Sequence, residues 1–165
     1  MSKIKEMTLL SMFIALAILL HMVEAAIPLP IFIPGFKLGF ANIVGLCAWK
    51  MFDFKMMIKV NGLRIIFASL FSGTIFNVGF YLSIAGFFLS TIAMAIAARF
   101  SKMSLYGISV AGSVFHNVGQ VLLISLIYEQ FFMQTFLPFL ILLAIPTGSI
   151  MAFMSLQIMK RYKGE

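Results

Sequence analysis

The hydrophobic residues of this 165-residue chain gather in six long runs, and the segments between the runs carry most of the charged residues. The runs do not alternate between apolar and polar positions, so they predict helices and not strands. A helix needs about 20 mostly apolar residues to cross a bilayer. The predicted membrane spans are 8–27, 38–52, 60–77, 80–98, 104–128 and 136–159. We therefore predict an all-α integral membrane protein with six transmembrane helices, forming a single transmembrane domain over residues 1–165.

The composition supports this class. Hydrophobic residues make up 62% of the chain and charged residues 10%, whereas an ordinary soluble domain has roughly 45–50% apolar and about 25% charged residues. A soluble core of this size cannot bury so much apolar surface. The first run continues to about Ile27 and five more follow, so we expect no cleaved signal peptide. The lone cysteine, Cys47, excludes an internal disulfide and a multi-cysteine metal site.

The positive charges predict the orientation. The net charge of +7 does not form a basic stripe of the kind that binds nucleic acid, because the lysines and arginines sit at the ends of the apolar runs. With both termini in the cytoplasm, the outer side carries only Lys37, and Arg64 lies inside the third span. We therefore predict a multi-pass protein of the plasma membrane with its N- and C-termini cytoplasmic. The inner side then carries Lys3, Lys5, Lys50, Lys55, Lys59, Arg99, Lys102, Lys160, Arg161 and Lys163.

The first outer loop is apolar and contains three prolines between Pro28 and Phe36. Prolines at this spacing exclude a regular helix. Two interpretations stay open: the loop folds back as a lid over a cavity, or it rests among the lipid headgroups.

Small residues recur at four-residue spacing in most of the predicted spans. Such pairs let two helices approach closely in a membrane, and any one of them also suits docking of another membrane protein. The pairs are Ser11/Ala15, Ala41/Gly45, Ser69/Gly73, Gly86/Ser90, Ala93/Ala97 and Ala144/Gly148/Ala152.

The fifth span carries the most informative polar pattern. Small and polar residues recur there at three- and four-residue steps, so they share one helical face. Asn117 lies about 100° round from His116 and faces a neighbouring helix. The face either lines a ligand pocket or forms an interhelical clasp worth about 0.6 kcal/mol per hydrogen bond. We favour the pocket, because His116, Asn117 and Gln120 exceed what a clasp requires. The stripe consists of Ser109, Gly112, Ser113, His116, Gly119 and Gln120.

Other polar residues within the spans are further candidates, because polar groups in a bilayer are costly. Arg64 either extends to the cytoplasmic headgroups or binds an anion. Asn42 and Asn77 either cap helices or face an outward cavity. Glu24 is either interfacial or forms a proton-linked pair with His21, one turn away.

Several chemistries are excluded. The single aspartate, Asp53, cannot form the Asp-rich magnesium motif that a prenyl diphosphate enzyme requires. No phosphate-binding loop for ATP is present, and serine, histidine and acidic residues do not form a nucleophile arrangement. His21 and His116 lie at different depths, which argues against haem. We therefore predict no catalytic residues, no metal and no cofactor.

Five sequence strings resemble the Gx transporter family, which is also labelled heptaprenyl diphosphate synthase component I. The resemblance extends from the first span to the sixth, and its most specific part is the His-Asn-x-x-Gly-Gln string. The strings are Leu38-Gly39-Phe40-Ala41-Asn42, Leu63-Arg64, Ser72-Gly73-Thr74, Ser83-Ile84-Ala85-Gly86 and Ser109-Val110-Ala111-Gly112-Ser113-Val114-Phe115-His116-Asn117-Val118-Gly119-Gln120.

That family is similar to the substrate-binding S components of energy-coupling factor (ECF) transporters, which are six-helix membrane proteins. The resemblance implies an S-component-like bundle with a pocket in its outer half, closed by the first outer loop. It also implies that a coupling subunit and two ATPases supply the energy, with Ser11 and Ala15 facing the coupling subunit.

The sequence thus predicts a substrate-binding membrane subunit of an uptake transporter for a vitamin-, flavin- or isoprenoid-like molecule. The predicted ligand contacts are His116, Asn117 and Gln120, with Asn42, Asn77 and Arg64 behind them. The alternative is a non-catalytic membrane accessory subunit of a prenyl diphosphate synthase or a membrane redox system. An enclosed polar pocket would distinguish the transporter subunit from the accessory subunit, because the accessory subunit needs only a packed core and a docking patch.

Overall fold

The computed structural model describes residues 3–26, 39–100 and 103–163, and these residues form six α-helices, one short 3-10 helix and no strand. The prediction of an all-helical protein is confirmed. The helices are α1 (Lys3–Ala26), α2 (Phe40–Met51), α3 (Phe54–Phe71), α4 (Val78–Phe100), α5 (Leu105–Ile127), η1 (Phe131–Phe136) and α6 (Leu137–Lys163).

Four helices are long and apolar enough to cross a membrane: α1, α4, α5 and the segment formed by η1 and α6. The other two α-helices, α2 and α3, do not meet this criterion, each for its own reason. Helix α2 has only 12 residues, and the 18 residues of α3 include three cations, Lys55, Lys59 and Arg64. The described chain therefore has the helices of a membrane-embedded protein, and α2 and α3 depend most on their neighbours.

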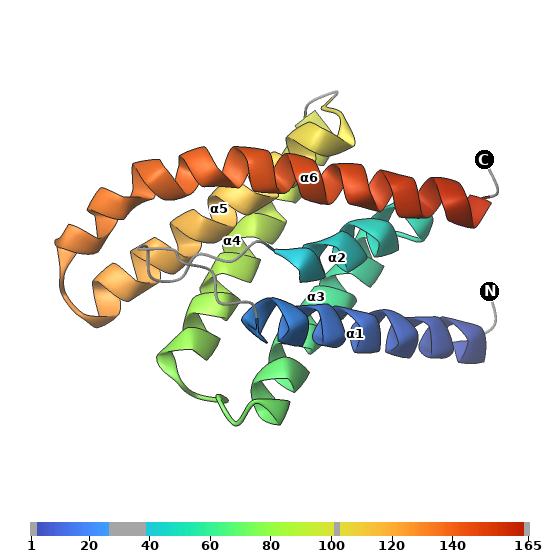
Figure 1. The fold of residues 1–165 in the computed structure, drawn as a ribbon, viewed down its shortest axis with the longest axis horizontal. Helices are drawn as coiled ribbons and strands as arrows, with labels where there is room; N and C mark the ends of the chain where they lie inside the picture. Colours follow the sequence, from blue (N-terminus) through green and yellow to red (C-terminus); the bar gives the residue numbers. More distant parts are fainter. Residues whose placement is uncertain (1–2, 27–38, 101–102, 164–165) are drawn as a thin grey trace.

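The helices form two groups of three (Figure 1). Helices α1, α2 and α3 pack on one another, and α5 packs against both α4 and α6. Contacts of α2 with α6 and of α3 with α4 join the groups. The Ser155 hydroxyl on α6 donates to the Ile43 carbonyl on α2 at 3.2 Å, fully buried. Most of α2 is buried, which explains how so short a helix is stable here.

Glycines set the close packing of α4, α5 and α6. A Cβ atom added to Gly119 would lie 2.6 Å from the Ala85 carbonyl oxygen, and one added to Gly148 would lie 2.8 Å from the Val110 Cα. Both distances are shorter than any van der Waals contact, so these helices touch through their backbones. Small residues do not all serve this purpose, since Ser11 and Ala15 lie on the exposed side of α1.

The predicted bounds of the third helix were wrong, because the helix runs over 54–71 and not 60–77. Asp53 starts it early by accepting a hydrogen bond from the Met56 amide at 2.6 Å, which is the bond of an N-cap. The chain leaves the helix before Gly73 and Phe76, whose φ angles are +63° and +68°. Arg64 is therefore the eleventh residue of α3 and lies roughly 15 Å along it.

Both ends of the described chain lie at one end of the long axis (Figure 1). Lys59 Nζ lies 3.2 Å from Glu6 Oε1, which links α3 to the first turns of α1 at that end. The proline-rich segment 28–36, predicted as a lid or an interfacial loop, falls within 27–38 and lies outside the described residues.

Candidate functional site

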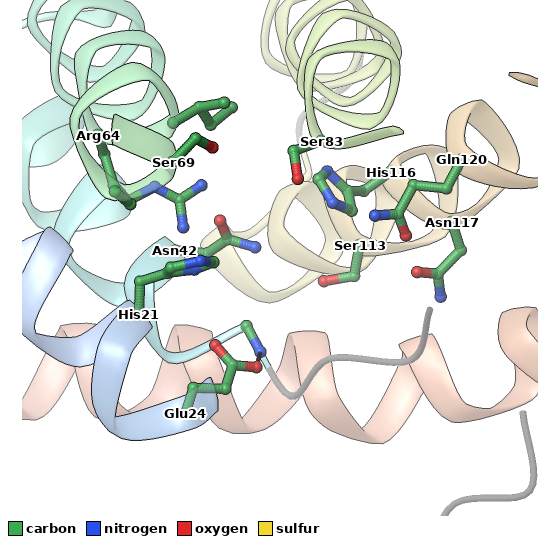
Figure 2. Close-up of a pocket in the computed structure, with 13 residues that line it drawn as sticks. His21, Glu24, Asn42, Arg64, Ser69, Ser83, Ser113, His116, Asn117 and Gln120 are labelled. Carbon is green, nitrogen blue, oxygen red and sulfur yellow. Dashed lines mark hydrogen bonds between the residues drawn. The ribbon is translucent and has the colours of Figure 1, made fainter. Parts of the chain in front are cut away.

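A polar cavity lies between the two groups of helices (Figure 2). With its open mouth it measures about 700 Å³. About 50 Å³ of it accepts the centres of water molecules, which is room for roughly three to five waters. Its walls come from five helices, α1 to α5. The lining residues are His21, Glu24, Gly39, Asn42, Arg64, Ile65, Ala68, Ser69, Ser83, Ser113, His116, Asn117 and Gln120.

One wall is formed by α5 with the start of α4, and it presents hydroxyl, amide and imidazole groups. A Cβ atom on Gly86 of α4 would lie 2.8 Å from the His116 ring, so the missing side chain makes room for the imidazole beside α4. Asn117 Nδ2 donates to the Leu140 carbonyl of α6 at 3.0 Å, as expected for a residue facing a neighbouring helix. Ser109, further along the stripe, donates to the Gly148 carbonyl at 2.7 Å. The stripe therefore contains both cavity-lining groups and interhelical clasps.

The opposite wall carries charge. Glu24 is buried near the end of α1, and its Oε1 accepts a hydrogen bond from the Gly39 amide at 2.5 Å. Gly39 has a φ of +89°, a left-handed conformation that glycine adopts without strain. This bond joins the end of α1 to the start of α2 and fixes the carboxylate at the cavity.

Arg64 of α3 is the second charged group of this wall, with 8% of its surface exposed. Its Nε atom is fully buried without a hydrogen-bond partner. Figure 2 shows its guanidinium directed toward the space between His21, Asn42 and Ser69. A position roughly 15 Å into α3 and on the cavity wall does not fit a side chain that extends to the cytoplasmic headgroups.

A smaller cavity adjoins the first and shares part of its wall: Asn42, Arg64, Ser113 and His116 line both. This second cavity accepts water centres over about 30 Å³. Asn61 lines it, with a buried Oδ1 atom that has no hydrogen-bond partner. Two adjoining cavities thus share the side chains of Asn42, Arg64, Ser113 and His116.

The structure brings together five of the six predicted ligand contacts: His116, Asn117, Gln120, Asn42 and Arg64. Asn77 does not join them. It is exposed in the turn between α3 and α4, where its backbone carbonyl accepts from the Phe80 amide at 2.9 Å. The predicted third span ended at Asn77, and the earlier end of α3 moves that residue into the turn.

Glu24, Ser69 and Ser83 are among the lining residues that were not predicted as contacts. Glu24 was paired with His21 as a separate feature, and both belong to the same cavity as Arg64. The serines give no sequence signal, because serine is common in membrane helices and Ser83 also bonds the Gly79 carbonyl of its own helix at 2.8 Å. Glu24 did give a signal, as a carboxylate inside an apolar run.

Within the part of the chain that is described, no three His, Cys, Asp or Glu residues lie close enough to hold a metal ion. The chemistry available at the cavity is therefore hydrogen bonding together with one buried cation and one buried carboxylate.

These features define a class: a membrane-embedded helical protein with a polar cavity between its two halves. The chain belongs to the heptaprenyl diphosphate synthase component I family, whose model matches residues 13–158. No curated protein and no solved structure matched the chain.

Proposed function

We propose that this protein is the substrate-binding membrane subunit of an uptake transporter, and that it holds a small molecule in the cavity between its two halves. The convergence of polar side chains from five helices supports this proposal most directly. Polar groups inside a membrane protein are costly and rare unless they serve a ligand or an ion. A cavity with a few convergent polar groups is the usual form of a small-molecule site.

Each wall has its own role in this proposal. His116 and Gln120 hydrogen-bond the ligand from α5, while Asn117 also holds α5 against α6. Asn42 and Arg64 contact the ligand from the opposite wall. The positive-inside rule puts both termini in the cytoplasm of a plasma-membrane protein with six spans. The cavity then opens toward the outer half, where α1 and α3 end.

A separate ATP-hydrolysing module supplies the energy, because the chain has no phosphate-binding loop of its own. We propose that the coupling subunit of an energy-coupling factor transporter docks on the exposed face of α1, which points away from the other helices. Ser11 and Ala15 are exposed there, together with a row of apolar side chains that includes Met12, Leu16 and Leu19. Small residues suit the close approach of a second membrane helix.

The family description favours a second candidate, a membrane accessory subunit of a heptaprenyl diphosphate synthase. The single aspartate of the chain does not supply a magnesium site for diphosphate chemistry. In this case the protein is not an enzyme and assists a catalytic partner. The cavity then holds part of an isoprenoid or no ligand.

Native mass spectrometry of gently purified protein tests the two candidates. We expect a small molecule to be retained by the wild type and lost in His116→Ala and Gln120→Ala. Asn77→Ala is the matched control, because Asn77 is a polar residue outside the cavity, and it should retain the molecule. An unliganded wild type that co-purifies with synthase or redox subunits would support the accessory subunit instead. Retention of the small molecule by both His116→Ala and Gln120→Ala would exclude this cavity as its binding site.

A further inference from the structure

Among the described residues, no carboxylate lies within 4.0 Å of the Arg64 guanidinium. The ion pair between Lys59 and Glu6 lies elsewhere, since neither residue lines the cavity. Arg64 Nε is buried and unbonded, and no hydrogen bond to the rest of the guanidinium is formed by the described residues. A guanidinium offers five N–H donors and no acceptor. Arg64 thus brings to the cavity wall a buried guanidinium whose Nε atom has no hydrogen-bond partner.

Glu24, whose carboxylate lines the same cavity, is the candidate for an anionic partner of Arg64, but it does not form an ion pair with the guanidinium. Its Oε1 accepts from the Gly39 amide, and its carboxylate lies beyond ion-pair distance from Arg64. A buried charge is costly unless it is paired and hydrogen-bonded. The buried charge of Arg64 therefore lacks an ion-pair partner among the described residues.

The facing wall shows what the rest of a ligand would meet. Ser83, Ser113, Asn117 and Gln120 offer neutral hydroxyl and amide groups there, beside His116. The guanidinium points across the same space (Figure 2). A molecule that satisfies both walls has an anionic group at one end and a neutral hydrogen-bonding part at the other.

We propose that the cavity recognises a small anion-bearing molecule, whose carboxylate or phosphate is held by the guanidinium of Arg64. This inference rests on the proposed binding function and names the class of its ligand. Arginine suits the role, because its planar fork binds carboxylate and phosphate through two parallel hydrogen bonds. His116 and Gln120 hold the neutral part from the opposite wall.

Binding of three probes to purified protein in detergent tests this inference: inorganic phosphate, pyrophosphate and acetate. We expect at least one of them to raise the unfolding temperature of the wild type. Affinity should fall at least about tenfold in Arg64→Gln, because hydrogen bonds to a charged group are lost. Arg64→Lys keeps the charge and should retain part of the affinity. Arg99→Gln is the matched control, because Arg99 is exposed on α4 and lines neither cavity.

Glu24→Gln gives an independent readout that does not require Arg64 to change. The amide oxygen still accepts from Gly39, while a negative charge near the anion is removed. Anion affinity should therefore rise in this variant, since repulsion between like charges is lost. A fall in affinity would contradict the inference, as would an Arg64→Gln variant that folds and binds the probes as tightly as the wild type. Failure of all three probes to shift the unfolding temperature would also overturn it.

Native mass spectrometry separates failure of this inference from failure of the proposed function. A retained neutral or cationic molecule that is lost in His116→Ala would overturn the anion inference and leave the binding function intact. A retained phospholipid that is lost in Arg64→Gln would support the anion site and contradict uptake of a soluble substrate. A retained soluble acid or phosphate ester that is lost in both variants would support both proposals.

Discussion

The two halves of the bundle line the same cavity with different chemistry and are held together in different ways. Helices α1 to α3 bring the charged groups, Glu24 and Arg64, whereas α4 and α5 bring amides, hydroxyls and one imidazole. The neutral half packs through backbone contacts at Gly119 and Gly148. The charged half packs around apolar side chains such as Ala17, Val44 and Val60, and the hydrogen bond from Gly39 to Glu24 links the end of α1 to the start of α2.

This difference indicates how the site is built. Close backbone packing fixes the helices of α4 to α6 relative to one another, and their side chains line the cavity as a consequence. The charged half places its groups near helix ends or against a second cavity, and it is held by fewer close approaches. We infer that α4 to α6 form the fixed platform of the site. The charged groups of the cavity, Glu24 and Arg64, lie on the other half.

Gly119→Ala tests the platform and should have the largest effect. Its Cβ would lie 2.6 Å from the Ala85 carbonyl oxygen, so α4 and α5 must move apart. Overpacking of this kind destabilises a protein by about 1–3 kcal/mol, which thermal unfolding in detergent would measure. Gly79→Ala is the matched control, because no described atom lies within 4 Å of its added Cβ. Equal unfolding temperatures for the two variants would remove the argument for a closely packed platform.

Gly39→Ala tests the charged half. The φ of +89° at this position is unfavourable for any residue with a Cβ atom. The cost is about 1–2 kcal/mol, and the start of α2 and the carboxylate of Glu24 should both be disturbed. We expect a lower unfolding temperature together with weaker anion binding, because a displaced start of α2 moves Asn42 in the cavity wall and releases the Glu24 carboxylate to compete for Arg64. Gly62→Ala serves as the control, since its Cβ would meet Phe87 at an ordinary 3.7 Å. A stable variant with unchanged binding would show that the Gly39 bond does not organise this wall.

Asn117→Ala should have the smallest effect on stability. It tests whether Asn117 serves as an interhelical hydrogen-bond clasp, as a ligand contact or as both. It removes the hydrogen bond to the Leu140 carbonyl, which in a membrane protein contributes about 0.6 kcal/mol. Ser149→Ala is the comparison, because the Ser149 hydroxyl bonds the Ile145 carbonyl within its own helix. A loss of ligand retention with almost unchanged unfolding temperature would show that Asn117 contacts the ligand. A loss of stability alone would show that it acts only as a clasp.

The sequence identified much of the candidate site, because polar residues in apolar runs are conspicuous. His116 and Gln120 followed from the helical period, Asn117 from its polar side chain within a span, and Arg64 from its charge. Asn77 was assigned wrongly to the end of a span because the N-cap at Asp53 and the turn at Gly73 were not recognised, and this moved the whole third helix by six residues. Glu24 was noticed but not connected with Arg64, because 40 positions separate them in the chain.

By itself, the sequence determined the class of the protein and the polar stripe of α5. Hydrophobic content and helical periodicity are local properties, and a membrane leaves a long apolar segment few alternatives to a helix. Only the tertiary structure decided that the two halves enclose one cavity and that Glu24 and Arg64 share it without forming an ion pair. Those outcomes depend on how closely particular helices approach, which glycines such as Gly86 and Gly119 set through contacts with distant residues.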